Sequence, residues 1–286
     1  MTNLSQIVVV TGMTGAGRGS AAKVLEKLGY FVIDNLPPSM LAAAVDTADA
    51  SDIDLLAVVV DARSREYFSR LIDELESLRK GGVAARILYL EASDEVLVRR
   101  QEAARRPHPL SREERLMDGF DRERELLRRI RGRADLVVDT TNLNVHQLGQ
   151  RIRAAFDDPS TGGLRATVMS FGFKYGLPID SDMVADLRFL PNPYWVDDLR
   201  PLSGLDAPVS DYVYKQPLSG QFLDKYEELI ALLTDGYLRE DQHFLTIALG
   251  CTGGRHRSVA MAEAFGDRLR AHGVRVLVVH RDLGRE

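Results

Sequence analysis

The stretch IVVVTGMTGAGRGSAAKVLEKLG, residues 7–29 of this 286-residue chain, decides the fold of its first half. Its first five residues, IVVVT, are apolar and mostly β-branched, which predicts a buried strand. The closing AAKVLEKLG (21–29) repeats apolar residues at helical spacing and ends at Gly29, a residue typical of helix ends. The sequence therefore predicts a strand, a glycine-rich loop and a helix in direct succession.

The loop, GMTGAGRGS (12–20), has the spacing of a P-loop, whose usual pattern is GxxxxGK followed by serine or threonine. Its glycines allow the backbone to curl so that N–H groups point at phosphate oxygens, at the positive end of the next helix. A glycine-rich turn without a ligand is the alternative. We expect nucleotide contacts from the whole loop: Gly12, Met13, Thr14, Gly15, Ala16, Gly17, Arg18 and Gly19.

Two side chains depart from the usual P-loop pattern. Arg18 stands where lysine is expected; it keeps the positive charge and forks onto two oxygens, but it is larger. Gly19 replaces the hydroxyl that ligates magnesium. Ser20 points about 100° further round the helix, which leaves Thr14 as another hydroxyl within reach. These changes affect catalysis more than binding.

The first half alternates short β-branched runs with helical stretches, which is typical of parallel strands joined by right-handed crossovers. We expect strands at 7–11, 30–34, 55–61, 86–91 and 135–139, and helices at 21–29, 64–82, 93–106, 111–133 and 145–156. Asp34 and Asp61 end strands, at the sheet edge where ligands gather. Asp61 also begins a polar turn, DARS (61–64), suited to magnesium or a base.

An arginine cluster precedes HPL (108–110) and resembles the lid of small P-loop kinases, although a solvated helix face has the same composition. It consists of Arg99, Arg100, Arg105 and Arg106. Turn-forming residues then gather in DDPSTGG (157–163), which indicates a linker. We place one domain at 1–158 and a second, smaller α/β domain at 165–286, with strands near 166–173, 244–250 and 274–280. The expected fold class is thus a P-loop NTPase domain, kinase-like, followed by that α/β domain.

Composition limits the function classes. No run of eighteen apolar residues and no targeting segment stands out, so we expect a cytoplasmic protein without membrane contact. Cys251 is the single cysteine, which excludes an intrachain disulfide and a multi-cysteine metal site. We predict no bound structural metal. The net charge of −5 does not indicate a broad nucleic-acid surface.

A second loop, GCTGGRHRS (250–258), lies between an apolar run and a helical stretch. Cys251, Arg257 and Ser258 have the spacing of cysteine-dependent phosphatases, which hold phosphate against a thiolate. Gly250 stands where those enzymes usually have histidine, and no general acid is apparent. A buried free cysteine is a second reading; a phosphate cradle that binds without cleaving fits the glycines and basic residues best, with His256 and His280 as possible helpers.

Five further segments accompany these loops: DNLPP (34–38), RRPHPL (105–110), ADLVVDT (134–140), FGFKYGLP (171–178) and DLRFLPNPYW (186–195), and the second loop itself continues to Val259 as GCTGGRHRSV (250–259). In combination they resemble the RapZ or YvcJ family of P-loop nucleotide-binding proteins, the RNase adapter family, along nearly the whole chain. The later segments are the more specific ones. The GAGR version of the glycine loop resembles the actinobacterial branch.

The resemblance implies a first domain that binds ATP or GTP, with Mg²⁺, and hydrolyses it slowly. It places nucleotide contacts on Gly12 to Gly19 and on a second motif, Asp61, Ala62, Arg63 and Ser64. It also implies homo-oligomers and a second domain that, in enterobacterial adapters, binds a small regulatory RNA and senses glucosamine 6-phosphate. The implied phosphate contacts are Cys251, Thr252, Gly253, Gly254, His256 and Arg257.

Two features differ from that family. Its usual NPHW is NPYW here, with Tyr194 in place of histidine, and the lysine-rich tail used for RNA is replaced by HRDLGRE (280–286). Few cationic phosphate contacts predict weak RNA binding. We therefore expect a nucleotide-binding regulator whose second domain takes a phosphorylated metabolite; a small-molecule kinase, an RNA-binding RNase adapter and, last, a cysteine phosphatase are the alternatives.

Overall fold

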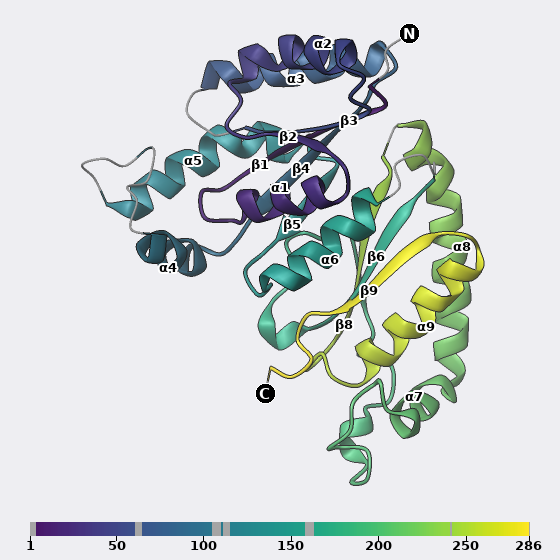
Figure 1. Cartoon of the computed structure of the whole chain (residues 1–286). Helices are drawn as coiled ribbons and strands as arrows, with labels where there is room; N and C mark the ends of the chain where they lie inside the picture. The colour runs from purple at the N-terminus through teal and green to yellow at the C-terminus, as the bar shows by residue number, and fades with distance from the viewer. Residues whose placement is uncertain are drawn as a thin grey trace. The chain divides into compact units, whose positions relative to one another are not determined.

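A computed structural model describes residues 4–60, 65–104, 110, 115–157, 163–240 and 242–285, without the side chains of 65–70 (Figure 1). The chain forms two compact units, Met1–Ser160 and Thr161–Glu286. Each unit has its own parallel sheet. No helix in the described ranges is long and apolar enough to cross a membrane.

The first unit places the glycine loop at the centre of a five-stranded sheet. Its strands are β1 (Gln6–Gly12), β2 (Phe31–Ile33), β3 (Leu55–Val59), β4 (Ala84–Glu91) and β5 (Leu136–Asp139), in the order β2-β3-β1-β4-β5. Every residue of β1 is buried, as its run of β-branched side chains predicts. Because all strands are parallel, their carboxyl ends share one edge, and the loop follows β1 at that edge.

Helices cover both faces of this sheet. They are α1 (Arg18–Lys27), α2 (Leu41–Ala50), α3 (Arg65–Lys80), α4 (Asp94–Ala104), α5 (Leu116–Arg131) and α6 (Val145–Phe156), with a short 3-10 helix at Pro38–Met40. Figure 1 shows α1 and α6 together on one side of the sheet and α2 and α3 on the other. α6 begins with a capping box in which Asn144 and Gln147 exchange side chain-to-backbone hydrogen bonds.

The second unit is a four-stranded parallel sheet in the order β7-β8-β6-β9. It contains β6 (Arg165–Gly172), β7 (Met183–Asp186), α7 (Ala207–Tyr214), α8 (Pro217–Arg239), β8 (Phe244–Cys251), α9 (Arg257–Ala271) and β9 (Arg275–His280), with 3-10 helices at Phe173–Tyr175 and Pro193–Trp195. The two central strands end together, since Gly172 of β6 is paired with Cys251 of β8. This register brings the cysteine loop beside the end of β6.

The predicted fold class is confirmed, because both units are α/β with parallel sheets and β1, the glycine loop and α1 follow one another as expected. The predictions missed β7 and α7, which lie in the proline-rich part of the second half. β7 is four residues long and only partly buried, so it lacks the apolar run that identifies a central strand.

Candidate functional site

The backbone of the glycine loop has the curvature that a phosphate-binding nest requires. Gly12 has a φ of +132°, and a Cβ added there would lie 2.0 Å from the carbonyl oxygen of Leu90 on β4. Gly17, the N-cap of α1, has a φ of +103°. Side chains other than hydrogen are excluded at the first position and strained at the second. The glycines are therefore needed for the loop to pass this close to β4 and enter α1.

The loop leaves a group of backbone N–H donors open. The amide of Met13 donates to Leu90 (2.9 Å), and that of Ala16 donates to the carbonyl of Met13 (3.0 Å). α1 has no side-chain N-cap and no acidic residue in its first turn. Four amides donate to no residue that the structure describes: those of Gly15, Gly17, Gly19 and Ser20. Open donors at a helix N-terminus form a site for an anion.

Arg18 lies at the carboxyl edge of the sheet. Its Nη1 donates to the carbonyl oxygen of Val60, directly after β3, at 3.4 Å. The predicted second contact motif, Asp61, Ala62, Arg63 and Ser64, follows Val60 and lies outside the described residues. Arg18 is therefore held at the last described residue before that motif.

Residue 19, where a P-loop usually carries the hydroxyl that ligates magnesium, faces unfilled space. Gly19 is exposed, and a Cβ added there would meet nothing within 4 Å. The hydroxyl of Thr14, the alternative donor considered from the sequence, donates instead to Glu123 at 2.7 Å. The usual magnesium ligand of a P-loop is thus absent at residue 19, and Thr14 does not replace it in this arrangement.

The arginines predicted to form a lid do not share one environment in the structure. Arg100 on α4 donates to the carbonyl of Gly15 (3.1 Å) and to Oγ1 of Thr140 (2.9 Å). Thr140 Oγ1 also lies 3.0 Å from the carbonyl of Ala16. Burial, and next the charge of Arg99, lower the pKa of Arg100. Arg99 is exposed, and Arg105 and Arg106 lie outside the described residues. Arg100 therefore acts as a structural residue that holds the backbone of the glycine loop in place.

The glycine loop is contacted by a buried carboxylate, and this carboxylate was not identified from the sequence. Glu123 on α5 is 1% exposed. Its Oε2 accepts from the backbone N–H of Thr14 at 2.9 Å, and its Oε1 accepts from the Thr14 hydroxyl at 2.7 Å. In the sequence Glu123 is one of many charged residues in a helical stretch, and nothing there separates it from its neighbours. One backbone amide of the nest, that of Thr14, therefore donates its hydrogen bond to an acidic side chain.

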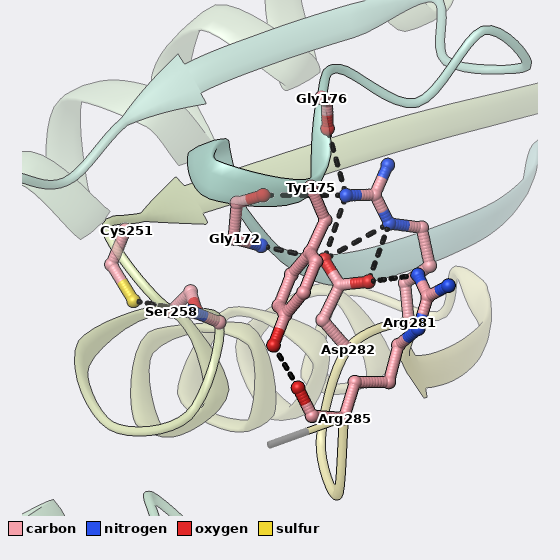
Figure 2. A network of polar contacts seen from close by, with 9 residues as sticks. Gly172, Tyr175, Gly176, Cys251, Ser258, Arg281, Asp282 and Arg285 are labelled. Carbon is pink, nitrogen blue, oxygen red and sulfur yellow. Dashed lines mark hydrogen bonds and ion pairs between the residues drawn. The ribbon is translucent and has the colours of Figure 1, made fainter.

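The cysteine loop of the second unit encloses its thiol. Cys251 ends β8 and is 3% exposed. Its Sγ lies 3.1 Å from Oγ of Ser258 and accepts from the N–H of Gly254 at 3.3 Å. Figure 2 shows the first of these contacts. The loop is therefore curled round the sulfur, with the serine after the arginine in contact with it.

Arg257, the first residue of α9, has a buried donor without an acceptor. The residue is 4% exposed. Its Nη1 donates to the carbonyl of Leu190 (2.9 Å) and its Nη2 to Oγ1 of Thr252 (3.2 Å). Its Nε is buried and has no hydrogen-bond partner among the described residues. Buried polar groups are nearly always paired, so this guanidinium is suited to one further acceptor, such as an anion in the loop.

A cavity of about 740 Å³ opens beside this loop. Five of the six predicted phosphate contacts line it: Cys251, Thr252, Gly253, His256 and Arg257. The sixth, Gly254, packs behind the loop, where an added Cβ would lie 2.7 Å from the nitrogen of Gly172. Lys174 brings further positive charge to the wall, where Arg200 is paired with Asp197 at 2.7 Å, and Tyr194 and Trp195 bring aromatic surface. The cavity is thus suited to an anion with a less polar body.

His256 and His280, the two histidines named from the sequence as helpers of the phosphate cradle, have different positions. His256 is 7% exposed and its Nε2 lies 3.3 Å from the carbonyl of Arg200. Burial lowers its pKa, so the ring is neutral near pH 7 and does not add a cation to the cavity. His280 contacts Ser170 (2.8 Å) and Glu263 (2.9 Å) instead and is not among the residues that line the cavity.

The carboxy-terminal segment supports the cysteine loop from behind (Figure 2). Asp282 is 2% exposed and accepts from the N–H of Gly172 at 2.8 Å. Arg281 donates to the same carboxylate at 2.7 Å and Arg285 at 2.9 Å. Because Gly172 is packed against the 253–254 backbone, Asp282 fixes the strand on which the loop rests. In the sequence, nothing marks Asp282 as a partner of Gly172.

Family models match both units. A model of the RapZ-like N-terminal domain matches residues 5–160, and a model of the RapZ C-terminal domain matches residues 164–284. The chain is 54% identical to a "Nucleotide-binding protein" of Streptomyces avermitilis, over 99% of this chain and 95% of the relative. It is 56% identical to "Nucleotide-binding protein Francci3_1634" of Frankia casuarinae, over 98% of each.

Among solved structures, overall similarity is low. Shikimate kinase from Bacteroides thetaiotaomicron aligns with 51% of this chain and 96% of its own, at 16% identity and a TM-score of 0.38. The tunicamycin resistance protein of Deinococcus radiodurans aligns with 53% and 95%, at 20% identity and a TM-score of 0.39.

Proposed function

The chain belongs to the RapZ family, and from this premise we propose that it is a regulatory protein that binds ATP or GTP and hydrolyses it slowly. The group of open amides at the N-terminus of α1 is the observation that carries the proposal. We assign the nucleotide to a domain spanning 1–158 and a phosphorylated metabolite to a second domain spanning 165–286.

Binding is supported by two features of the loop and by the names of the relatives. Its open amides and the positive end of α1 are complementary to phosphate oxygens. Arg18 adds a full positive charge at the same edge of the sheet. The relatives over 50% identical to this chain carry the name nucleotide-binding protein. We extend the contacts to Asp61, Ala62, Arg63 and Ser64, which follow β3 in the chain.

Slow turnover follows from what the loop lacks. Without a hydroxyl at Gly19, Mg²⁺ loses the ligand that normally fixes it beside the phosphates. Stabilising the charge that develops on the transferred phosphoryl group is the main catalytic requirement of such sites. A loop that supplies amides and an arginine, but no magnesium ligand at this position, favours binding over rapid hydrolysis.

In the second unit we propose an amino-sugar phosphate, such as glucosamine 6-phosphate, as the ligand. The unpaired Nε of Arg257 and the loop amides are suited to the phosphate group. Asp197 lines the same cavity and is complementary to an ammonium group, while Trp195 offers an apolar wall. Cleavage is not part of this proposal, because the thiol of Cys251 is enclosed by its own loop.

The family resemblance extends the proposal to homo-oligomers and to a macromolecular partner, RNA or protein. The net charge of −5 favours a protein, because the sequence-independent part of RNA affinity needs many cationic contacts to phosphate. A gel-shift with RNA at increasing salt separates the two classes. Affinity that falls steeply with salt identifies RNA as the partner.

Calorimetric titration with ATP and GTP tests the nucleotide site. Arg18→Ala is expected to weaken binding by about tenfold, as loss of one charge-assisted contact does. Lys23→Ala is the matched control, since Lys23 is an exposed cation on the same helix. Equal affinity of Arg18→Ala and wild type removes Arg18 from the site. Failure of wild-type protein to bind either nucleotide overturns the proposal.

Labelled ATP distinguishes slow hydrolysis from small-molecule kinase activity. The proposal expects the terminal phosphate to appear in solution. Phosphate found on an added sugar would favour the kinase alternative instead.

A further inference from the structure

Trp195 is a large aromatic side chain that the second unit leaves uncovered. It is the single tryptophan of the chain, and it is 76% exposed. Tryptophan is highly buried on average, because its large ring system gains much from contact with apolar groups. Trp195 lines the cavity beside the cysteine loop, as Arg257 does. An open indole in the wall of a cavity is suited to contact with a ligand.

Two hydrogen bonds tie the segment that carries Trp195 to the cysteine loop. Before the tryptophan, the carbonyl of Leu190 accepts from Nη1 of Arg257 at 2.9 Å. After it, the carbonyl of Arg200 lies 3.3 Å from Nε2 of His256. Arg257 is the residue whose buried Nε has no hydrogen-bond partner among the described residues. The segment is thus fixed on both sides of the indole to the two loop residues that precede and carry this open donor.

The backbone at Trp195 is itself held in place. The residue ends the 3-10 helix Pro193–Trp195, and its N–H donates to the carbonyl of Asn192 at 3.2 Å. Nε of Arg200 donates to the carbonyl of Tyr194, the middle residue of this helix, at 3.0 Å. A surface whose backbone is already fixed loses little conformational freedom when a ligand binds.

The neighbouring aromatic ring leaves a face of the indole open. Trp195 contacts the ring of Tyr194 with 5.3 Å between the centroids and 84° between the planes. In such an edge-to-face contact at most one face of each ring is covered. Tyr194 also has the guanidinium of Arg200 over its ring. The ring of Tyr194 is therefore used within the protein, whereas the indole offers a flat apolar face to the cavity.

We propose that Trp195 is a specificity-determining residue whose indole face stacks on the ring of a cyclic phosphorylated ligand held at Arg257. The inference rests on the phosphate site proposed above and adds what that site selects beyond the phosphate. The cavity volume of about 740 Å³ is in the range of small-molecule sites, and a phosphate group fills only part of it. A sugar ring presents a flat face of C–H groups that an indole covers, and an acyclic chain does not. The site therefore selects a cyclic sugar phosphate over an acyclic one.

The fluorescence of the full-length protein reports on residue 195 directly, because the chain has a single tryptophan. Glucosamine 6-phosphate is expected to change the tryptophan emission, since its ring displaces water from the indole. It is also expected to bind at least about tenfold more tightly than acyclic glycerol 3-phosphate, as measured by calorimetry. Inorganic phosphate is expected to leave the emission unchanged. Binding of glucosamine 6-phosphate without a change in emission overturns the inference and leaves the phosphate site in place.

Trp195→Ala separates the ring of the ligand from its phosphate. The variant is expected to weaken binding of glucosamine 6-phosphate about tenfold. Its affinity for glycerol 3-phosphate is expected to change less than about twofold. Trp195→Phe keeps an aromatic face and is expected to bind glucosamine 6-phosphate within about threefold of wild type. Equal weakening for both ligands in Trp195→Ala would assign Trp195 to the shape of the loop and overturn the inference.

Leu232→Ala is the matched control. Leu232 is 75% exposed, as open as Trp195, but it lies on α8 and is not among the residues that line the cavity. This variant is expected to keep the wild-type affinity for each ligand. The same loss in Leu232→Ala and Trp195→Ala would assign the effect to exposed apolar surface in general and overturn the inference. Failure of wild-type protein to bind any of the three phosphates instead overturns the phosphate site itself.

Discussion

Replacing Gly172 by alanine tests whether β6 and the cysteine loop have to touch through their backbones. A Cβ added at Gly172 would lie 2.6 Å from the carbonyl carbon of Gly253 and 2.8 Å from the nitrogen of Gly254. The nearest of these contacts is roughly 0.8 Å shorter than ordinary van der Waals contact, and backbone atoms in a packed interior yield little. The loop must therefore shift away from β6.

The cost has two parts. Overpacking of a filled interior costs about 1–3 kcal/mol. The shift also strains the hydrogen bond from Gly172 to buried Asp282, and a bond to a charged group contributes about 1.5–3 kcal/mol. Together these predict a loss of about 2.5–6 kcal/mol, and for a unit of this size the melting temperature falls by roughly 10–24 °C.

Scanning calorimetry of the full chain measures the loss, and titration with glucosamine 6-phosphate measures the site. Gly253→Ala is the control, because a Cβ there meets nothing within 4 Å. It is expected to change stability by less than about 1 kcal/mol. The reasoning is refuted if Gly172→Ala melts at the wild-type temperature and keeps the wild-type affinity.

Three further predictions concern single residues. Gly12→Ala, whose Cβ would lie 2.0 Å from a carbonyl of β4, is expected to destabilise the first unit by more than about 4 kcal/mol; a wild-type midpoint in urea would contradict this. Gly19→Ser, at an open position, is expected to raise magnesium-dependent ATP hydrolysis about tenfold, and unchanged phosphate release would show that magnesium needs no ligand there. His256 has its pKa lowered by burial from 6.5, so the unfolded chain takes up the proton first and stability falls as pH drops below about 6.5. Melting temperatures measured between pH 7.5 and 5.5 check this prediction. In His256→Gln the melting temperature should depend less steeply on pH. The dependence that remains is due to His280, because burial lowers the pKa of that residue as well.

Local patterns in the sequence were enough for the parts of the fold that depend on neighbours in the chain. The β-branched run before Gly12 and the spacing of the loop glycines predicted β1, the nest and a helix after it, because each depends on a few consecutive residues. The predicted helix began at residue 21, whereas α1 begins at Arg18. The cysteine loop was found in the same way. β7 was missed because a short, partly exposed strand has no distinct period.

Such local patterns do not predict the contacts between distant residues that complete each site. Glu123 lies 109 residues from Thr14, and Asp282 lies 110 residues from Gly172. Nothing in the periodicity of a helix indicates which of its many charged residues faces a distant loop. The sheet order and register bring these pairs together, and one sequence alone does not determine them.

The two loops use a distant carboxylate in opposite ways. Asp282 binds the amide of Gly172, a residue beside the cysteine loop, and so leaves the donors of the loop and the Nε of Arg257 for a ligand. Glu123 binds an amide of the glycine loop itself. The two carboxylates thus act at different places: Asp282 supports the strand beside one loop, and Glu123 accepts directly from an amide of the other.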